Sequence, residues 1–80
     1  MTTQHAHILL GEAIIHIMRE PRRHLFHKCV DNADLAMGHL DRGNNGEAVR
    51  MAEQCITNGG ARYLIPFKRE VERVAGGRSE

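Results

Sequence analysis

The stretch from Asp41 to Glu47 reads DRGNNGE, a polar break between two segments that have clear helical periodicity. Gly43 can adopt the left-handed conformation that closes a helix. Asn44, followed three residues later by Glu47, is typical of a capping box at the start of a helix. This stretch therefore predicts the turn of a helical hairpin that spans residues 21–58.

Apolar residues on both sides of this turn recur at three-and-four spacing, which indicates helices with one buried face. The pattern predicts a first helix that starts near residue 2 or 3 and ends near 20, a second over 21–42 and a third over 45–58. We therefore expect an all-α fold, a small bundle built around the hairpin.

The last part of the chain is expected to contain a short C-terminal helix. Pro66 disfavours helix in the residue before it, which predicts a turn or an extended piece over 61–65 and a helix that begins at the proline. Residues 76–80 are expected to fray as a tail. The prediction is thus one domain over residues 1–80, with three main helices and a short fourth.

Composition limits both the core and the partners. A chain of 80 residues with one Tyr, two Phe and no Trp must build its core from aliphatic side chains. A core of this size is marginal, and oligomerisation is one way to extend it. The formal net charge of +1 gives no global field that would attract nucleic acid or an acidic membrane.

The sequence also favours a cytoplasmic protein. Cys29 and Cys55 fall on apolar positions of predicted helices, where free thiols behave as small hydrophobes, and a disulfide between them is the less favoured alternative. The apolar run from Ala6 to Met18 is too short to span a bilayer, and no basic segment precedes it as in a secretory signal. We therefore expect no membrane association.

The hairpin resembles a tetratricopeptide unit over roughly residues 33–58. Leu35, Gly43 and Ala48 stand at the leucine, the turn glycine and the close-packing alanine of that family. The family has large residues at four positions where this chain has Asn32, His39, Asn45 and Ala52. No second copy follows at the period of about 34 residues, so we interpret the resemblance as shared helical-hairpin geometry.

The first helix carries more apolar side chains than one buried face requires. At helical spacing they cover well over half of its circumference. The second covering surface is either the C-terminal segment or another copy of the protein, and we favour another copy. The residues expected to form this self-association surface are Ile8, Leu10, Ile14, Ile15, Ile17 and Met18.

Positive charge is concentrated where the second helix is predicted to begin, although the backbone dipole is already positive there. One interpretation is an anionic partner, either a phosphate backbone or an acidic protein surface, bound by these side chains and by free amides. The interpretation we favour is that the arginines complement the carbonyl end of the first helix and are otherwise solvated. The candidate residues are Arg19, Arg22, Arg23 and Lys28.

Six histidines are an unusual number for this length. His24 and His27 stand three apart, a spacing at which two imidazoles can reach one metal ion, but a third and a fourth ligand are missing nearby. We interpret the histidines as solvated and expect no metal and no cofactor. No nucleophile and base occur in a known motif, so no enzymatic activity is expected.

A DNA-binding helix-turn-helix is an alternative. Cys55, Gly59 and Ile65 have the small, glycine and aliphatic spacing of such units, but Pro66 would fall inside the recognition helix. Nucleic acid is therefore not the favoured partner. If it were bound, the phosphate contacts would come from Arg62, Lys68, Arg69 and Arg73.

These patterns favour a non-catalytic protein-interaction module that binds another protein and forms a homodimer. An adaptor, an inhibitor or an accessory regulator from a bacterium or a phage is typical of such a chain. A nucleic-acid-binding regulator is the first alternative, and a metal-binding helical protein is the second.

Overall fold

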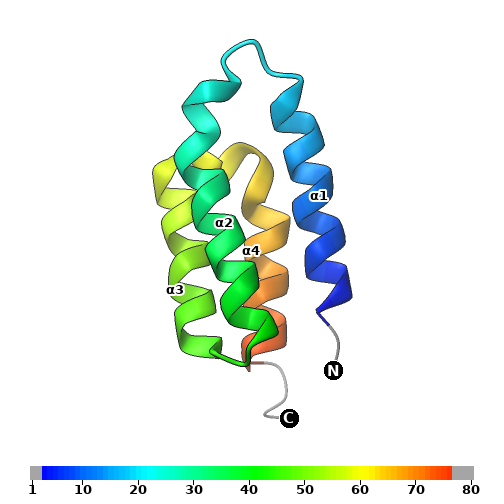
Figure 1. Ribbon diagram of the computed structural model, residues 1–80, viewed down its shortest axis with the longest axis vertical. Helices are drawn as coiled ribbons and strands as arrows, with labels where there is room; N and C mark the ends of the chain where they lie inside the picture. The colour runs from blue at the N-terminus through cyan, green and yellow to red at the C-terminus, as the bar shows by residue number, and fades with distance from the viewer. Residues whose placement is uncertain (1–2, 77–80) are drawn as a thin grey trace.

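The computed structural model describes residues 3–76, which form four α-helices that run alternately up and down (Figure 1). The helices are α1 (Gln4–Met18), α2 (His27–Asp41), α3 (Asn45–Cys55) and α4 (Ala61–Gly76). A 3₁₀ turn, Arg23–Phe26, precedes α2, and a wide π-type turn, Ile56–Gly60, joins α3 to α4. The predicted all-α bundle is confirmed. Of the expected tail, residues 77–80 lie outside the described part of the chain.

The α2–α3 hairpin closes as the sequence predicts. Gly43 has a φ of +82°, the left-handed conformation that favours glycine. The Gly43 amide donates to the Leu40 carbonyl at 3.1 Å and the Asn44 amide donates to the His39 carbonyl at 2.8 Å, which together form a Schellman motif.

The expected capping box is absent, however. The Asn44 side chain makes no capping hydrogen bond; its Nδ2 lies 3.4 Å from Nδ1 of His39. Glu47 is bonded to Arg50 instead of reaching back to the Asn44 amide. The α2–α3 turn therefore depends on the Gly43 backbone more than on side-chain caps.

Large core side chains come mainly from α4. Phe67, Leu64 and Val71 are three of the five largest fully buried side chains, and the other two are Cys29 and Cys55. The other helices meet α4 through small residues that allow close approach: Ala6, Ala13, Ala33, Ala36, Ala48 and Ala52, all at most 4% exposed. The α2–α3 hairpin therefore contributes mainly small side chains where it meets α4, and α4 contributes most of the largest buried ones.

The prediction of a turn or an extended piece over 61–65 is wrong, because α4 starts at Ala61 and includes Pro66. The proline lacks only the amide that would bond the Arg62 carbonyl, one turn from the helix start, and both residues are exposed to water. In return, Leu64 joins the buried stripe with Phe67 and Val71. Burial of this stripe outweighs the lost hydrogen bond.

The connection between α1 and α2 also differs from the prediction of a helix that starts at Pro21. Helix α1 ends at Met18, and the chain reverses before the 3₁₀ turn begins at Arg23. Amides of Arg19 and Glu20 bond the last carbonyls of α1, at His16 and Ile17, which tightens its end. Residues 19–22 are thus used for the reversal, and α2 starts only at His27.

Helix α1 packs chiefly on α4 and less closely on α2, and polar contacts hold its N-terminal end. Thr3 Oγ1 donates to Asp41 at 2.6 Å, and His7 Nε2 lies 3.0 Å from the same carboxylate. On the other side of α1, His5 lies 3.5 Å from Glu70, which also accepts two bonds from Arg73. Glu70 is only 6% exposed.

Both cysteines are free and fully buried, as the sequence predicts. Their thiols donate to carbonyls one turn earlier, Cys29 to Phe26 at 3.1 Å and Cys55 to Ala52 at 3.0 Å. Burial, with a further effect of Cys29, raises the pKa of Cys55 to about 12. These thiols are therefore core side chains that remain protonated at neutral pH.

Candidate functional site

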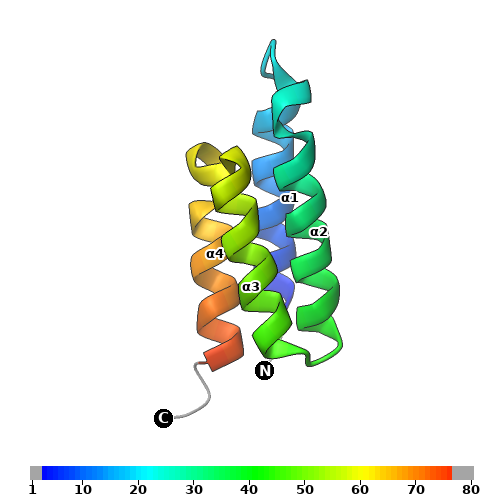
Figure 2. The same ribbon diagram turned by 90° about the vertical axis from the view of Figure 1, so that its left-hand side faces the viewer.

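The end of α1, the 3₁₀ turn and the start of α2 form a corner that extends past the α3–α4 turn (Figures 1 and 2). We call residues 14–30 the α1–α2 corner. In the view of Figure 1, α3 and α4 do not reach as far up as the corner. The side chains that the corner directs toward the bundle are therefore only partly covered. Ile14, Phe26 and Val30 are half-buried, and Met18 and Leu25 are exposed.

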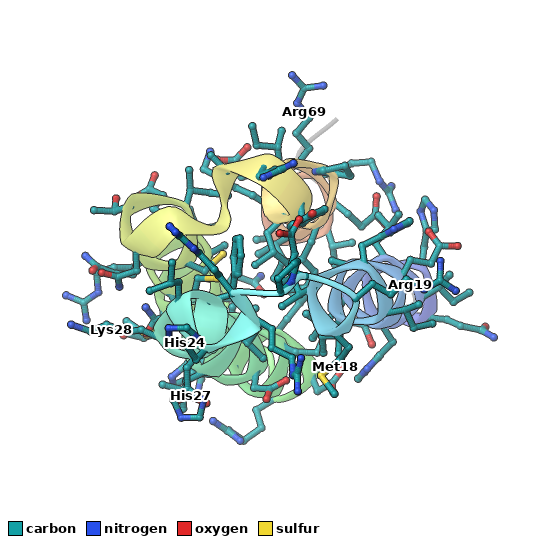
Figure 3. The ribbon with its side chains drawn as sticks, turned by 90° about the horizontal axis from the view of Figure 1, so that it is seen from above. Met18, Arg19, His24, His27, Lys28 and Arg69 are labelled. Carbon is teal, nitrogen blue, oxygen red and sulfur yellow. The ribbon has the colours of Figure 1, made fainter. Side chains whose placement is uncertain are left out.

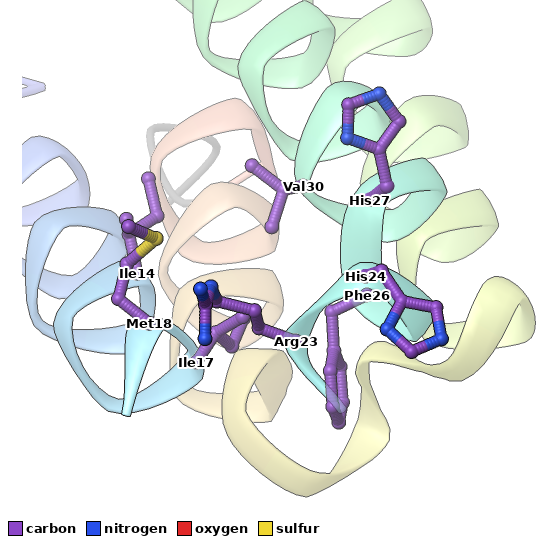
Figure 4. A pocket seen from close by; sticks show the side chains of 8 residues that line it. All are labelled: Ile14, Ile17, Met18, Arg23, His24, Phe26, His27 and Val30. Carbon is purple, nitrogen blue, oxygen red and sulfur yellow. The ribbon is translucent and has the colours of Figure 1, made fainter. Parts of the chain in front are cut away.

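A cavity of about 320 Å³ lies in this corner, between α1 and α2. Its lining combines apolar side chains with three basic or imidazole groups (Figure 4): Ile14, Ile17, Met18, Phe26 and Val30, with Arg23, His24 and His27. The last turn of α1 supplies the first three, and the 3₁₀ turn and the first turn of α2 supply the others. The structure thus places an apolar hollow next to one guanidinium and two imidazoles.

Aromatic and polar contacts fix the corner to the start of α4. Tyr63 stacks on His16 with ring centroids 6.1 Å apart and meets the edge of Phe26 at 5.6 Å. Its hydroxyl donates to Glu20, and Arg62 lies 3.7 Å from the same carboxylate. The bond to Glu20 raises the pKa of Tyr63. Because Phe26 lines the cavity, its contact with Tyr63 packs one wall of the cavity against α4.

The four basic residues predicted to bind an anion are all exposed. None of them forms an ion pair with a carboxylate within residues 3–76. Of Arg19, Arg22, Arg23 and Lys28, only Arg23 lines the cavity. Seen from above, Arg19 and Lys28 extend on opposite sides of the corner (Figure 3). Arg19, Arg23 and Lys28 therefore do not converge on one point.

The six residues predicted for self-association divide into two groups. Leu10 and Ile17 are 5% and 3% exposed, so they pack inside this chain and leave no surface for a second copy. Ile8, Ile15 and Met18 are 49%, 54% and 61% exposed, and Ile14 is half-buried at the cavity. The expected surface is therefore narrower than predicted, because α4 covers part of the apolar arc of α1.

Three of the six histidines, His5, His7 and His16, make contacts between helices. His24 and His27 both line the cavity but point in different directions (Figure 4), and His27 lies 3.7 Å from Asp31. Within residues 3–76, no three His, Cys, Asp or Glu side chains are grouped so that they could hold a metal ion. His5, His7 and His16 instead contact Glu70, Asp41 and Tyr63.

The arrangement of α3 and α4 differs from a DNA-binding helix-turn-helix. The two helices lie side by side and antiparallel (Figures 1 and 2), whereas a recognition helix crosses its partner steeply and projects from it. Three of the four residues considered for phosphate contacts are paired within the chain: Arg62 with Glu20, Lys68 with Glu72 and Arg73 with Glu70. Only Arg69 keeps its charge unpaired among these four.

Two features of the corner were missed from the sequence. Glu20 and Tyr63 are 43 residues apart, and neither belongs to a motif that would connect them. Three-and-four spacing places Phe26 and Val30 on the apolar face of the second helix, but it does not show where a neighbouring helix is missing. The one available signal was the change from apolar to basic residues around Pro21.

Comparison of the chain with protein-family models, with curated proteins and with solved structures found no match. The resemblance to a tetratricopeptide unit thus has no support beyond the hairpin geometry, and Leu35, at the family's leucine position, is 53% exposed. Across residues 3–76, no helix combines the length and the apolar character needed to cross a membrane.

Proposed function

We propose that this protein acts by non-catalytic association with another protein and forms a homodimer through the outer face of α1. The observation that carries the proposal is the exposure of apolar side chains on α1 and in the 3₁₀ turn that follows it. Four of the six exposed large apolar residues described between residues 3 and 76 lie between positions 8 and 25: Ile8, Ile15, Met18 and Leu25.

The spacing of these residues supports a continuous contact surface. Ile8 and Ile15 are seven residues apart, two turns of helix, so they lie on the same face of α1. Each is half-exposed, and covering its remaining surface gains on the order of 1 kcal/mol. Because association also costs translational and side-chain freedom, this gain suits a weak dimer that forms at high micromolar concentration.

The role we propose for this module is that of a cytoplasmic adaptor, inhibitor or accessory regulator, encoded by a bacterium or a phage. The two buried free thiols fit a reducing compartment. The arginine-rich composition fits such a source. No observation in the corner favours catalysis, since the cavity lining lacks a nucleophile held by a base.

Light scattering over a concentration series tests self-association. We expect the average mass to rise from monomer toward dimer, and Ile15→Glu to keep the protein monomeric because it places a charge in the contact. Leu35→Glu is the matched control, because Leu35 on α2 is 53% exposed, almost as Ile15 is on α1, and lies outside the proposed surface. A monomer at high micromolar concentration would reject the dimer.

A further inference from the structure

The α1–α2 corner combines a hollow with charge that the chain itself leaves unpaired. Residues 19–28 contain four Arg or Lys side chains and one carboxylate, Glu20. Glu20 is already bonded to Tyr63 and lies next to Arg62. Other basic residues, such as Arg50, Lys68 and Arg73, have carboxylate partners on their own helices. The corner is therefore where the described chain most lacks negative charge.

The volume of the cavity indicates the size of the group that it can accept. A volume of about 320 Å³ lies at the lower end of the range of small-molecule sites, roughly 300–1,000 Å³. Since the cavity opens between the ends of two antiparallel helices, a third helix can lie across it and insert one large side chain. This is the helix-in-groove mode, in which an amphipathic helix places its apolar anchors between other helices.

A second copy of this chain does not suit the cavity and the basic side chains around it, although Ile15, on the outer face of α1, belongs to the proposed dimer surface. In a two-fold symmetric contact the same patch meets itself, so Arg22, Arg23 and Lys28 of one protomer would oppose the same cations of the other. Like charges placed together in an interface oppose association. A membrane surface suits the corner less well than a protein: Met18 and Leu25 are exposed, but Ile17 and Phe26 line a recess that a flat surface would leave unfilled.

We infer that the α1–α2 corner is a docking site for an amphipathic helix of a partner protein that carries carboxylates on both sides of one large apolar anchor. The anchor enters the cavity against Ile14, Met18 and Val30. The carboxylates meet Arg23 at the cavity and Arg19 or Lys28 on the flanks. This inference rests on the proposed function, protein association, and adds the chemistry of the partner.

Selection from a display library of random peptides tests the inference. Peptides of about 15 residues, roughly four helical turns, are selected on the folded protein and sequenced. We expect the selected pool to be enriched in Asp and Glu around one Phe, Leu, Met or Trp. Binding of a selected peptide should weaken as salt is added, because the contacts on the flanks are exposed to solvent.

Charge reversal identifies the site. Arg23→Glu should weaken binding of the selected peptide by about tenfold or more. Arg69→Glu is the matched control: it makes the same charge change at an exposed, unpaired arginine that points away from the corner (Figure 3), and it should leave the affinity within about twofold. Val30→Phe should weaken binding whatever the charge of the peptide, because the larger side chain occupies the cavity. Circular dichroism confirms that each variant is folded.

The remaining outcomes overturn the inference. They are a selected pool without acidic enrichment, binding that Arg23→Glu and Arg69→Glu weaken equally, or a pool that does not rise above the unselected library. Sedimentation with phosphatidylcholine–phosphatidylglycerol vesicles, together with no acidic pool, would assign the corner to a membrane surface. If the protein dimerises, Ile15→Glu abolishes the dimer and no acidic peptides are selected, only the docking site is rejected. If the protein stays monomeric but selects acidic peptides, only the homodimer is rejected.

Discussion

Gly60 lies at the turn from α3 into α4, where neighbouring atoms leave no room for a side chain. A Cβ atom there would lie 2.6 Å from the Cys55 carbonyl oxygen and 2.9 Å from Leu64 Cδ1. We expect Gly60→Ala to lower the free energy of unfolding by about 1–3 kcal/mol, since the backbone of α3 or the packing of Leu64 must shift. Urea unfolding followed by circular dichroism measures the change.

Gly11 provides the matched control for Gly60. It lies in the middle of α1, is exposed, and a Cβ atom there would have no neighbour within 4 Å. Gly11→Ala should therefore raise the free energy of unfolding by about 0.5–1 kcal/mol, because alanine restricts the unfolded chain and favours helix. Equal effects of the two substitutions would contradict the close packing at Gly60.

The thiols of Cys29 and Cys55 are expected to be unreactive in the folded protein. Both are fully buried, and burial is the main cause that raises the pKa of each, to about 12 for Cys55. Because the thiolate is the reactive form, a disulfide reagent such as Ellman's reagent should label neither thiol at neutral pH. Both should react after unfolding in denaturant. Rapid labelling of the native protein would show that the core opens locally at α2 or α3.

At the scale of helices, the hairpin was readable from the sequence and α4 was not. Gly43 marks the α2–α3 turn through its positive φ, a local property that needs no tertiary information. Pro66 is an equally strong local signal, but its effect depends on how much a helix through it can bury. The 3-4-3 spacing of Leu64, Phe67, Val71 and Val74 carries that information, because Leu64 joins the stripe only if helix precedes Pro66.

The candidate site was predictable only in pieces. Arg23 and Met18 were named from the sequence, one for charge and the other for apolar surface, but nothing local indicated that both line one cavity. That outcome depends on how far α3 and α4 extend beside α1 and α2. In the turn after α3, Asn58 and Gly59 leave the helical conformation, and Gly59 has a φ of +102°. This turn prevents α3 from continuing beside the corner. A turn far along the chain thus leaves the corner uncovered.

For the whole molecule, the attachment of α1 connects stability to pH. The Thr3 hydrogen bond is the largest cause that lowers the pKa of Asp41, and His7 adds to it. The hydrogen bonds from Arg73 are the largest cause that lowers the pKa of Glu70, with a contribution from His5. These two carboxylates connect the N-terminal half of α1 to α2 and α4. Their ionised forms therefore help to hold α1 against the other three helices.

The direction of the pH effect follows from these shifts. Both carboxylates bind protons more weakly when folded than at their ordinary pKa values of 3.8 and 4.5, so acid favours the unfolded chain. Their contribution is fully present above the ordinary values and is lost as pH falls through the lowered folded values. Asp34 acts in the opposite sense, because burial and then Asp31 raise its pKa. Glu47 acts in the same sense as Asp41 and Glu70, because hydrogen bonds from Arg50 lower its pKa. The expected net effect is a loss of stability in acid, since three carboxylates have lowered pKa values and one has a raised value.

We therefore expect the melting temperature to fall by several degrees between about pH 6 and about pH 3. Asp41→Asn combined with Glu70→Gln should lower it at neutral pH and flatten its decline in acid, because the paired carboxylates are gone. Glu53→Gln is the control, since Glu53 is an exposed carboxylate on α3 that lies outside both pairs. Thermal unfolding followed by circular dichroism measures all three proteins. If the double variant kept the full acid decline, other groups would control acid unfolding and α1 would be held mainly by Ala6, Leu10, Ala13 and Ile17.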